Sequence, residues 1–158
     1  MFIEWMSLTH CHQALEKASL GRLGCARDNQ PYVVPTYFAF DGTSIYGFST
    51  LGQKITWMRD NPCVCLEIDE RITHDQWMSV VVTGRYEELP DRPAYESARR
   101  HAYKLLQRQP MWWEPAAIPA IHHNQETTFV PVYYRILIDQ ISGMRATPSL
   151  APHRVDNH

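Results

Sequence analysis

Hydrophobic and polar residues alternate with different periods along this chain, and the changes of period predict its elements. Residues 9–18 have the spacing of a helix, and Ser7 and Thr9 are suitable N-caps. The next segments are rich in β-branched and aromatic residues, which is typical of strands. They are residues 22–27, 31–40 and 43–48. Residues 28–30 and the Asp41-Gly42 pair would join them as tight turns.

The rest of the chain predicts two more helices and three more strands. A helix over 53–60 is ended by Asn61-Pro62, and Pro90 precedes a third helix. The long strand expected at 78–89 contains Gly84, which suggests a bulge. The third helix is expected at 92–106 and the strands at 63–68, 78–89 and 127–139.

Two segments lack a clear period. Residues 107–126 contain three prolines and predict a long ordered loop, and residues 144–158 predict a flexible tail. Residues 1–143 are therefore expected to form one α+β domain around a closed or nearly closed antiparallel sheet.

Composition narrows the class of protein. The 158 residues carry 15 basic and 17 acidic side chains, a net charge of −2, which argues against nucleic acid as a partner. No apolar run approaches the ~20 residues that span a bilayer, and the first residues do not resemble a signal peptide. We therefore expect a cytoplasmic protein without membrane contact. Its four cysteines are expected to be reduced thiols.

The segment between a predicted strand and the second helix carries the most informative chemistry. Ser49, Thr50, Gly52 and Lys54 lie where a strand gives way to a helix. The start of a helix offers unpaired N–H groups, two hydroxyls could add hydrogen bonds, and a lysine adds a positive charge. This combination suits a phosphate group. The alternative is that Ser49 or Thr50 caps the helix and Lys54 is solvated.

Other chemical groups have simpler explanations beside functional ones. Cys63 and Cys65 are better read as thiols on one face of a strand than as metal ligands, and no metal site is expected. His122 and His123 could reach a substrate, a metal or haem, or their side chains could point apart. Trp112 and Trp113 could line a substrate pocket, or they could pack in a dimer contact.

An ordered set of short motifs gives the sequence a familiar pattern. They are Gly21-Arg22-Leu23-Gly24, residues 30–35, Asp41-Gly42, Ile45-Tyr46, Gly52-Gln53-Lys54, residues 61–65 and residues 77–84. With these spacings the chain resembles the pyridoxamine 5′-phosphate oxidase-related, FMN-binding split-barrel proteins. The branch it is most similar to includes nitroimidazole-resistance proteins. The resemblance covers residues 6–89, and more weakly 134–143.

The resemblance implies a cofactor, a set of contacts and a partner. Ser49, Thr50, Gln53 and Lys54 would hold the phosphate of FMN. The backbone of Val34, Pro35, Thr36 and Tyr37 would follow the edge of the isoalloxazine ring and offer it N–H groups. The family implies a homodimer with FMN at the subunit interface, and Trp77 and Ser79 would approach the cofactor, with the second subunit as one possible source.

Two positions depart from the family pattern. Many relatives carry Arg at the position of Gln53, so one positive charge is missing here, and Arg22 is a weaker candidate to supply it. In the nitroimidazole branch a His often occupies the position of Phe48. Its absence lowers the expectation of nitro-group reduction, and Phe48 is expected to fill the core or to pack beside the ring.

The resemblance predicts an FMN-dependent oxidoreductase that passes electrons from NAD(P)H to a small-molecule acceptor. No residue is assigned as a proton donor, because the flavin itself carries this chemistry. Two alternatives remain open: a non-catalytic flavin or haem binder, and a relative that uses a deazaflavin. Oxidation of pyridoxamine phosphate is the least favoured activity.

Overall fold

The computed structural model describes residues 1–108 and 131–149. The strands are β1 (Phe2–Trp5), β2 (Leu20–Arg27), β3 (Gln30–Phe40), β4 (Ser44–Thr50), β5 (Cys63–Arg71), β6 (Trp77–Glu88) and β7 (Pro131–Thr147). The helices are α1 (Leu8–Lys17), α2 (Gln53–Asp60), the short 3₁₀ turn η1 (Pro93–Tyr95) and α3 (Glu96–Leu106). Within these residues no helix is long and apolar enough to cross a membrane.

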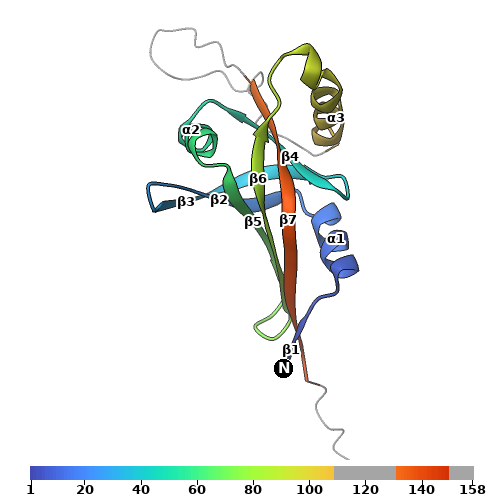
Figure 1. Ribbon diagram of the computed structural model, residues 1–158. Helices are drawn as coiled ribbons and strands as arrows, with labels where there is room; N and C mark the ends of the chain where they lie inside the picture. The colour runs from blue at the N-terminus through green and yellow to red at the C-terminus, as the bar shows by residue number, and fades with distance from the viewer. Residues whose placement is uncertain (109–130, 150–158) are drawn as a thin grey trace, which may run out of the picture.

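The seven strands form one antiparallel sheet that closes on itself. The strand order is β1-β7-β4-β3-β2-β5-β6, and β7 also pairs with β6, which completes the ring. Figure 1 shows α1 and α3 on one side of this barrel and α2 on the other. The predicted α+β antiparallel barrel with packing helices is therefore confirmed.

Both predicted hairpin turns are present, and their residues explain them. Asp28 and Asn29 have φ of 50° and 63°, the left-handed conformation that a two-residue hairpin needs. At the next turn Gly42 has φ of 92°, and Asp41 Oδ1 accepts hydrogen bonds from the N–H groups of Thr43 (2.9 Å) and Ser44 (2.8 Å). Local chemistry therefore fixes both connections.

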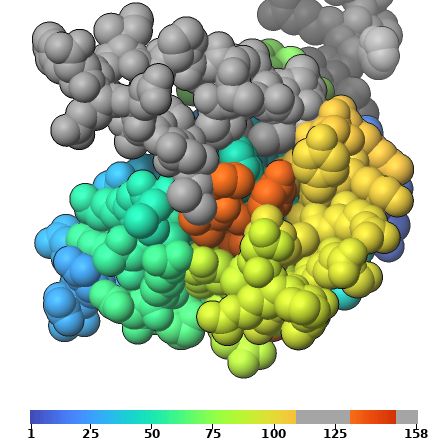
Figure 2. Space-filling model, turned by 90° about the horizontal axis from the view of Figure 1, so that it is seen from above, coloured from blue at the N-terminus to red at the C-terminus, as the bar shows by residue number. Residues whose placement is uncertain are grey.

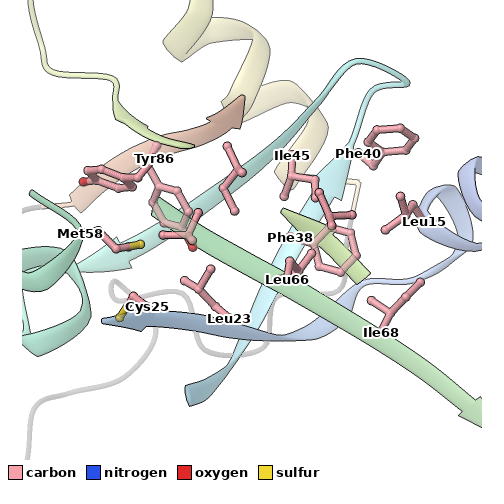
Figure 3. Close-up of a cluster of buried hydrophobic side chains, with 14 of the residues drawn as sticks. Leu15, Leu23, Cys25, Phe38, Phe40, Ile45, Met58, Leu66, Ile68 and Tyr86 are labelled. Carbon is pink, nitrogen blue, oxygen red and sulfur yellow. The ribbon is translucent and has the colours of Figure 1, made fainter. Parts of the chain in front are cut away.

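The core runs through the barrel between the helices. Leu15 from α1 lies near one end and Met58 from α2 near the other, with Phe38 and Leu66 between them (Figure 3). A smaller cluster around Leu89 and Ala102 joins α3 to the barrel. Figure 2 views the end of the barrel where α2 and α3 lie on opposite sides of β7.

Several predicted bounds are corrected by the structure. β1 was not predicted, and β7 continues to Thr147 although the strand was expected to end at Asp139 and a flexible tail to begin at 144. The extension exists because β7 has partners on both edges: Met144–Thr147 pairs with β1 and Met144–Ala146 with β6. The predicted bulge at Gly84 is confirmed by a register shift between Thr83 and Gly84. The expected loop at 107–126 lies almost wholly outside the described residues.

Candidate functional site: an opening between β3 and β4

The backbone pairing of two neighbouring strands stops part-way along their length, and the unpaired stretch between them is called the opening. β3 and β4 pair only from Phe38–Phe40 to Ile45–Gly47. Beyond Gly47, β4 continues to pair with β7, while the earlier part of β3, from Gln30 to Tyr37, pairs with β2. The predicted ring-binding segment, Val34–Tyr37, lies on the β3 side of this opening, and Ser49 and Thr50 lie on the β4 side.

The prolines of β3 show which way its backbone groups point. Pro31 and Pro35 lie opposite Ala26 and Arg22 of β2, and neither can donate a hydrogen bond to that strand. The N–H of Phe38 donates to the carbonyl of Ser19 at 3.0 Å. Because the pattern alternates along a strand, the backbone N–H and C=O groups of the even-numbered residues of β3 point toward β2.

The same alternation corrects the expected contacts of the ring-binding segment. Val34 and Thr36 direct their N–H groups to β2, and Pro35 has no N–H. The segment therefore cannot offer the predicted row of N–H groups to a ligand. The backbone groups that face the opening belong to its odd-numbered residues.

Among the described residues, no side chain caps the N-terminus of α2. Gly52 is the N-cap residue and has no side chain to accept a hydrogen bond from the first N–H groups of this helix. Ser49 Oγ instead donates to the carbonyl of Thr50 at 3.0 Å. The alternative that Ser49 or Thr50 caps the helix is therefore wrong, and the positive end of the helix dipole lacks an anionic or hydroxyl partner within the described residues.

Lys54 is in the first turn of this helix and is half-buried. Burial lowers the pKa of its ammonium group, and the nearby Cys25 thiol partly offsets this effect. Among the described residues no carboxylate forms an ion pair with Lys54. A partly desolvated cation without a counter-ion, beside an uncapped helix start, favours an anion. Gln53, the other predicted phosphate contact, is exposed.

Two departures from the family pattern can now be placed. Arg22, considered as a replacement for the missing positive charge, pairs instead with Asp69 and with Glu67 (3.5 Å) on the outer face of β2 and β5. It therefore does not supply a charge to the α2 terminus. Phe48 is half-buried and packs against the ring of Tyr133, with ring centroids 5.1 Å apart. It lies on the β4 side of the opening rather than in the central core.

Trp77 and Ser79 lie elsewhere in the chain. They begin β6, at the end opposite Glu88, the residue of β6 that pairs with Arg59 of α2 (2.7 Å). Ser79 Oγ donates to Glu67 Oε1 at 3.0 Å, within the same outer-face group as Arg22. One chain therefore does not bring Trp77 and Ser79 to the start of α2. Trp112 and Trp113, and the histidines at 122 and 123, lie outside the described residues.

A shallow groove lies on the side of the barrel where β2 and β5 also part. These strands pair only from Arg22–Gly24 to Cys65–Glu67, and the groove of about 480 Å³ follows the end of that pairing. Cys63, Cys65 and Tyr32 are among its lining residues. Val33 beside them is 63% exposed, so this part of the sheet presents apolar surface without a covering helix in the described chain.

One feature of the opening was missed by sequence reasoning. The buried hydroxyl of Tyr134 in β7 lies 3.3 Å from Thr36 Oγ1 in β3, and its ring lies against Gly47 of β4. The available signal was Gly47, because a glycine inside a strand often marks a close approach by another group.

Comparisons with known proteins agree with this architecture. A family model described as pyridoxamine 5′-phosphate oxidase matches residues 7–145. A protein of uncharacterised function from Rhizobium meliloti strain 1021 is 41% identical over 146 residues, which are 92% of this chain and 97% of that protein.

Solved structures are similar over nearly the whole chain. An FAD-binding protein from Mesorhizobium loti is 41% identical, with 94% of this chain and 99% of that chain covered and a TM-score of 0.76. A candidate 5-nitroimidazole antibiotic resistance protein from Bacteroides thetaiotaomicron is 18% identical, with 94% and 93% covered and a TM-score of 0.64. The second likeness shows the fold alone.

Proposed function

The chain belongs to the pyridoxamine 5′-phosphate oxidase family, and from this premise we propose that it is an FMN-dependent oxidoreductase with its cofactor in the opening between β3 and β4. The observation that carries the proposal is the uncapped start of α2 together with Lys54, a half-buried lysine without a carboxylate partner in the described residues. This pair of features fits a phosphate group.

The chain's own residues would bind and orient the cofactor. Lys54 and the first N–H groups of α2 hold the phosphate, and Ser49 and Thr50 border it on β4. The odd-numbered backbone groups of β3 face the ring. A bound flavin would supply two-electron redox chemistry between NADH or NADPH and a small oxidised acceptor.

FAD is the second candidate cofactor. The Mesorhizobium loti relative, 41% identical, is described as FAD-binding. Both flavins carry a phosphate on the same ribityl chain, so the helix start and Lys54 suit either one. FMN remains the first choice because the anion site is short, consisting of one helix terminus and one lysine.

A homodimer completes the proposal. Trp77 and Ser79, which the family pattern brings to the cofactor, lie at the end of β6 opposite its contact with α2 through Glu88. A second copy, packed on the outer face of β2, β5 and β6, would bring its own Trp77 and Ser79 to the first copy's opening. The exposed apolar surface at Val33 and the groove beside it support this contact.

Flavin titration of the purified full chain tests the proposal. Absorbance and flavin fluorescence are followed as FMN, FAD or a deazaflavin is added, and the Lys54→Ala variant is compared with Lys104→Ala, which removes an exposed lysine of α3. We expect one flavin per chain, at least tenfold weaker binding in Lys54→Ala, and no change in Lys104→Ala.

The outcomes separate the candidate functions. The proposed site is contradicted if the chain binds none of the flavins. It is also contradicted if Lys54→Ala and Lys104→Ala weaken binding equally. If FAD or the deazaflavin binds more tightly than FMN, that flavin takes the place of FMN as the assigned cofactor. Flavin binding without oxidation of NADH or NADPH, with oxygen or a nitroaromatic compound as acceptor, would favour a non-catalytic flavin carrier.

A further inference from the structure

The side chain of Tyr134 crosses from β7 over β4 to β3. In the sheet Tyr134 lies opposite Gly47, and Gly47 lies opposite Phe38. A Cβ at Gly47 would overlap the Cζ and hydroxyl of Tyr134, so the glycine is what lets the phenol lie flat across β4. The hydroxyl then reaches Thr36 Oγ1 at 3.3 Å.

This bond joins the two sides of the opening at the point where the strands part. Phe38 and Gly47 are the last paired residues, and Thr36 is two residues beyond Phe38 on the same inward face of β3. Thr36 is 5% exposed and Tyr134 1%, so water does not compete for the bond. A side chain of β7 thus continues the connection where the backbone ladder stops.

The surroundings of Tyr134 favour one position for its hydroxyl. The ring of Tyr86 lies on it, with centroids 5.4 Å apart, and confines it from the β6 side. Burial raises the pKa of Tyr134, although the bond to Thr36 opposes this, so the hydroxyl keeps its proton at neutral pH. The phenol is therefore a neutral, fixed partner for Thr36.

We propose that Tyr134 is a positioning residue that sets the separation of β3 from β4 through Thr36, and thereby the geometry with which the opening holds the flavin ring. This inference rests on the proposed function. In this proposal Tyr134 does not contact the flavin. It acts through Thr36, whose neighbours Val34, Pro35 and Tyr37 form the β3 side of the opening.

The test uses three variants of the full chain. Tyr134→Phe keeps the ring and removes the hydroxyl, and Thr36→Val removes the hydroxyl on the other side while keeping the shape. Tyr86→Phe is the matched control, because its hydroxyl bonds Glu88 Oε2 (3.0 Å) on the far side of the ring pair. Each is titrated with FMN and FAD, and the absorption bands of the bound flavin are recorded.

We expect Tyr134→Phe and Thr36→Val each to raise the flavin dissociation constant about fivefold, as for the loss of one buried hydrogen bond, and to shift the flavin bands. The double variant should bind no more weakly than either single one, because both remove the same bond. Tyr86→Phe should match the wild type in affinity and spectrum.

The results distinguish this inference from the proposed function. If the wild-type chain binds no flavin, both the proposed function and the role of Tyr134 are contradicted. A wild-type chain that binds flavin, with an unchanged constant and spectrum in Tyr134→Phe, overturns only the role of Tyr134, and so do additive effects in the double variant. If Tyr134→Phe fails to fold, Thr36→Val decides by the same readouts.

Discussion

Two seams of the barrel, each the boundary between two neighbouring strands, are built in opposite ways. β6 and β7 pair at twelve positions from Trp77 to Glu88, with one register shift at Thr83–Gly84, whereas β3 and β4 pair at three. The first seam is closed by backbone hydrogen bonds. The second is held at its closed end by the turn at Asp41 and beyond it by the side-chain bond from Tyr134 to Thr36.

The difference supports the proposed position of the ligand. A continuous ladder satisfies its own N–H and carbonyl groups and offers them to nothing else. Where the ladder stops, the two strands are no longer held together by backbone hydrogen bonds, and the stability of the region depends on a few side chains. Stability and binding are therefore expected to separate between the two seams.

The largest effect is expected from Gly84→Ala in the closed seam. A Cβ at this bulge would overlap the carbonyl oxygen of Leu137, which is backbone and cannot turn away. We expect a loss of about 3 kcal/mol in the free energy of unfolding, measured by denaturant titration. The remaining folded protein should bind flavin as the wild type does, and a loss of stability below about 1 kcal/mol would contradict the close packing of this seam.

A smaller effect is expected from Asp41→Asn at the closed end of the β3–β4 seam. Burial alone would raise the pKa of Asp41, but the N–H of Ser44, His101 and the N–H of Thr43 together hold it below its ordinary value. Because the folded pKa is lowered, the carboxylate stabilises the fold above pH 3.8 and this contribution is lost as pH falls through the folded pKa.

We expect Asp41→Asn to cost about 1 kcal/mol at pH 7, and the difference from the wild type to disappear in acid. The matched control is Asp139→Asn, whose exposed pair with Arg85 (3.5 Å) belongs to the closed seam and should be worth at most about 0.5 kcal/mol. Thermal unfolding between pH 2 and 7 measures both. Equal losses in the two variants would remove the special role of the turn.

The smallest effect on stability, and the one that reverses with ligand, is expected from Lys54→Met. Because burial lowers the pKa of Lys54, the charged group opposes folding at neutral pH, and this cost fades as pH rises toward 10.5. Without flavin the variant should be slightly more stable than the wild type at pH 7. With saturating flavin it should be less stable.

Thermal shift assays with and without FMN measure this reversal. If the Lys54→Met variant is destabilised equally with and without flavin, Lys54 stabilises the fold rather than binding the ligand. The opening would then differ from the closed seam in packing alone.

The sequence predicted most elements because their signals are local. The helix at 53–60 has its predicted bounds, and the turns at Asp28 and Asp41 carry residues that dictate their conformations. The start of α2 could be predicted as an anion site, but not distinguished from a helix capped by Ser49 or Thr50. That distinction depends on where the helix begins, and Gly52 is its N-cap residue.

The rest depends on contacts between distant residues. β1 is four residues long and is defined by its pairing with the end of β7, which also extends β7 past the predicted boundary. Thr36 and Tyr134 are 98 positions apart, and their bond depends on the absence of a side chain at Gly47 between them. No local pattern contains such an arrangement.

Hydrogen–deuterium exchange of the full chain, with and without saturating flavin, tests the central claim most directly. The account predicts that flavin slows exchange in residues 30–37 and 48–55, the two sides of the opening and the first turn of α2. Residues 80–88 of the closed seam should already be protected without ligand and should change little. Flavin that binds without protecting either side of the opening would contradict the account.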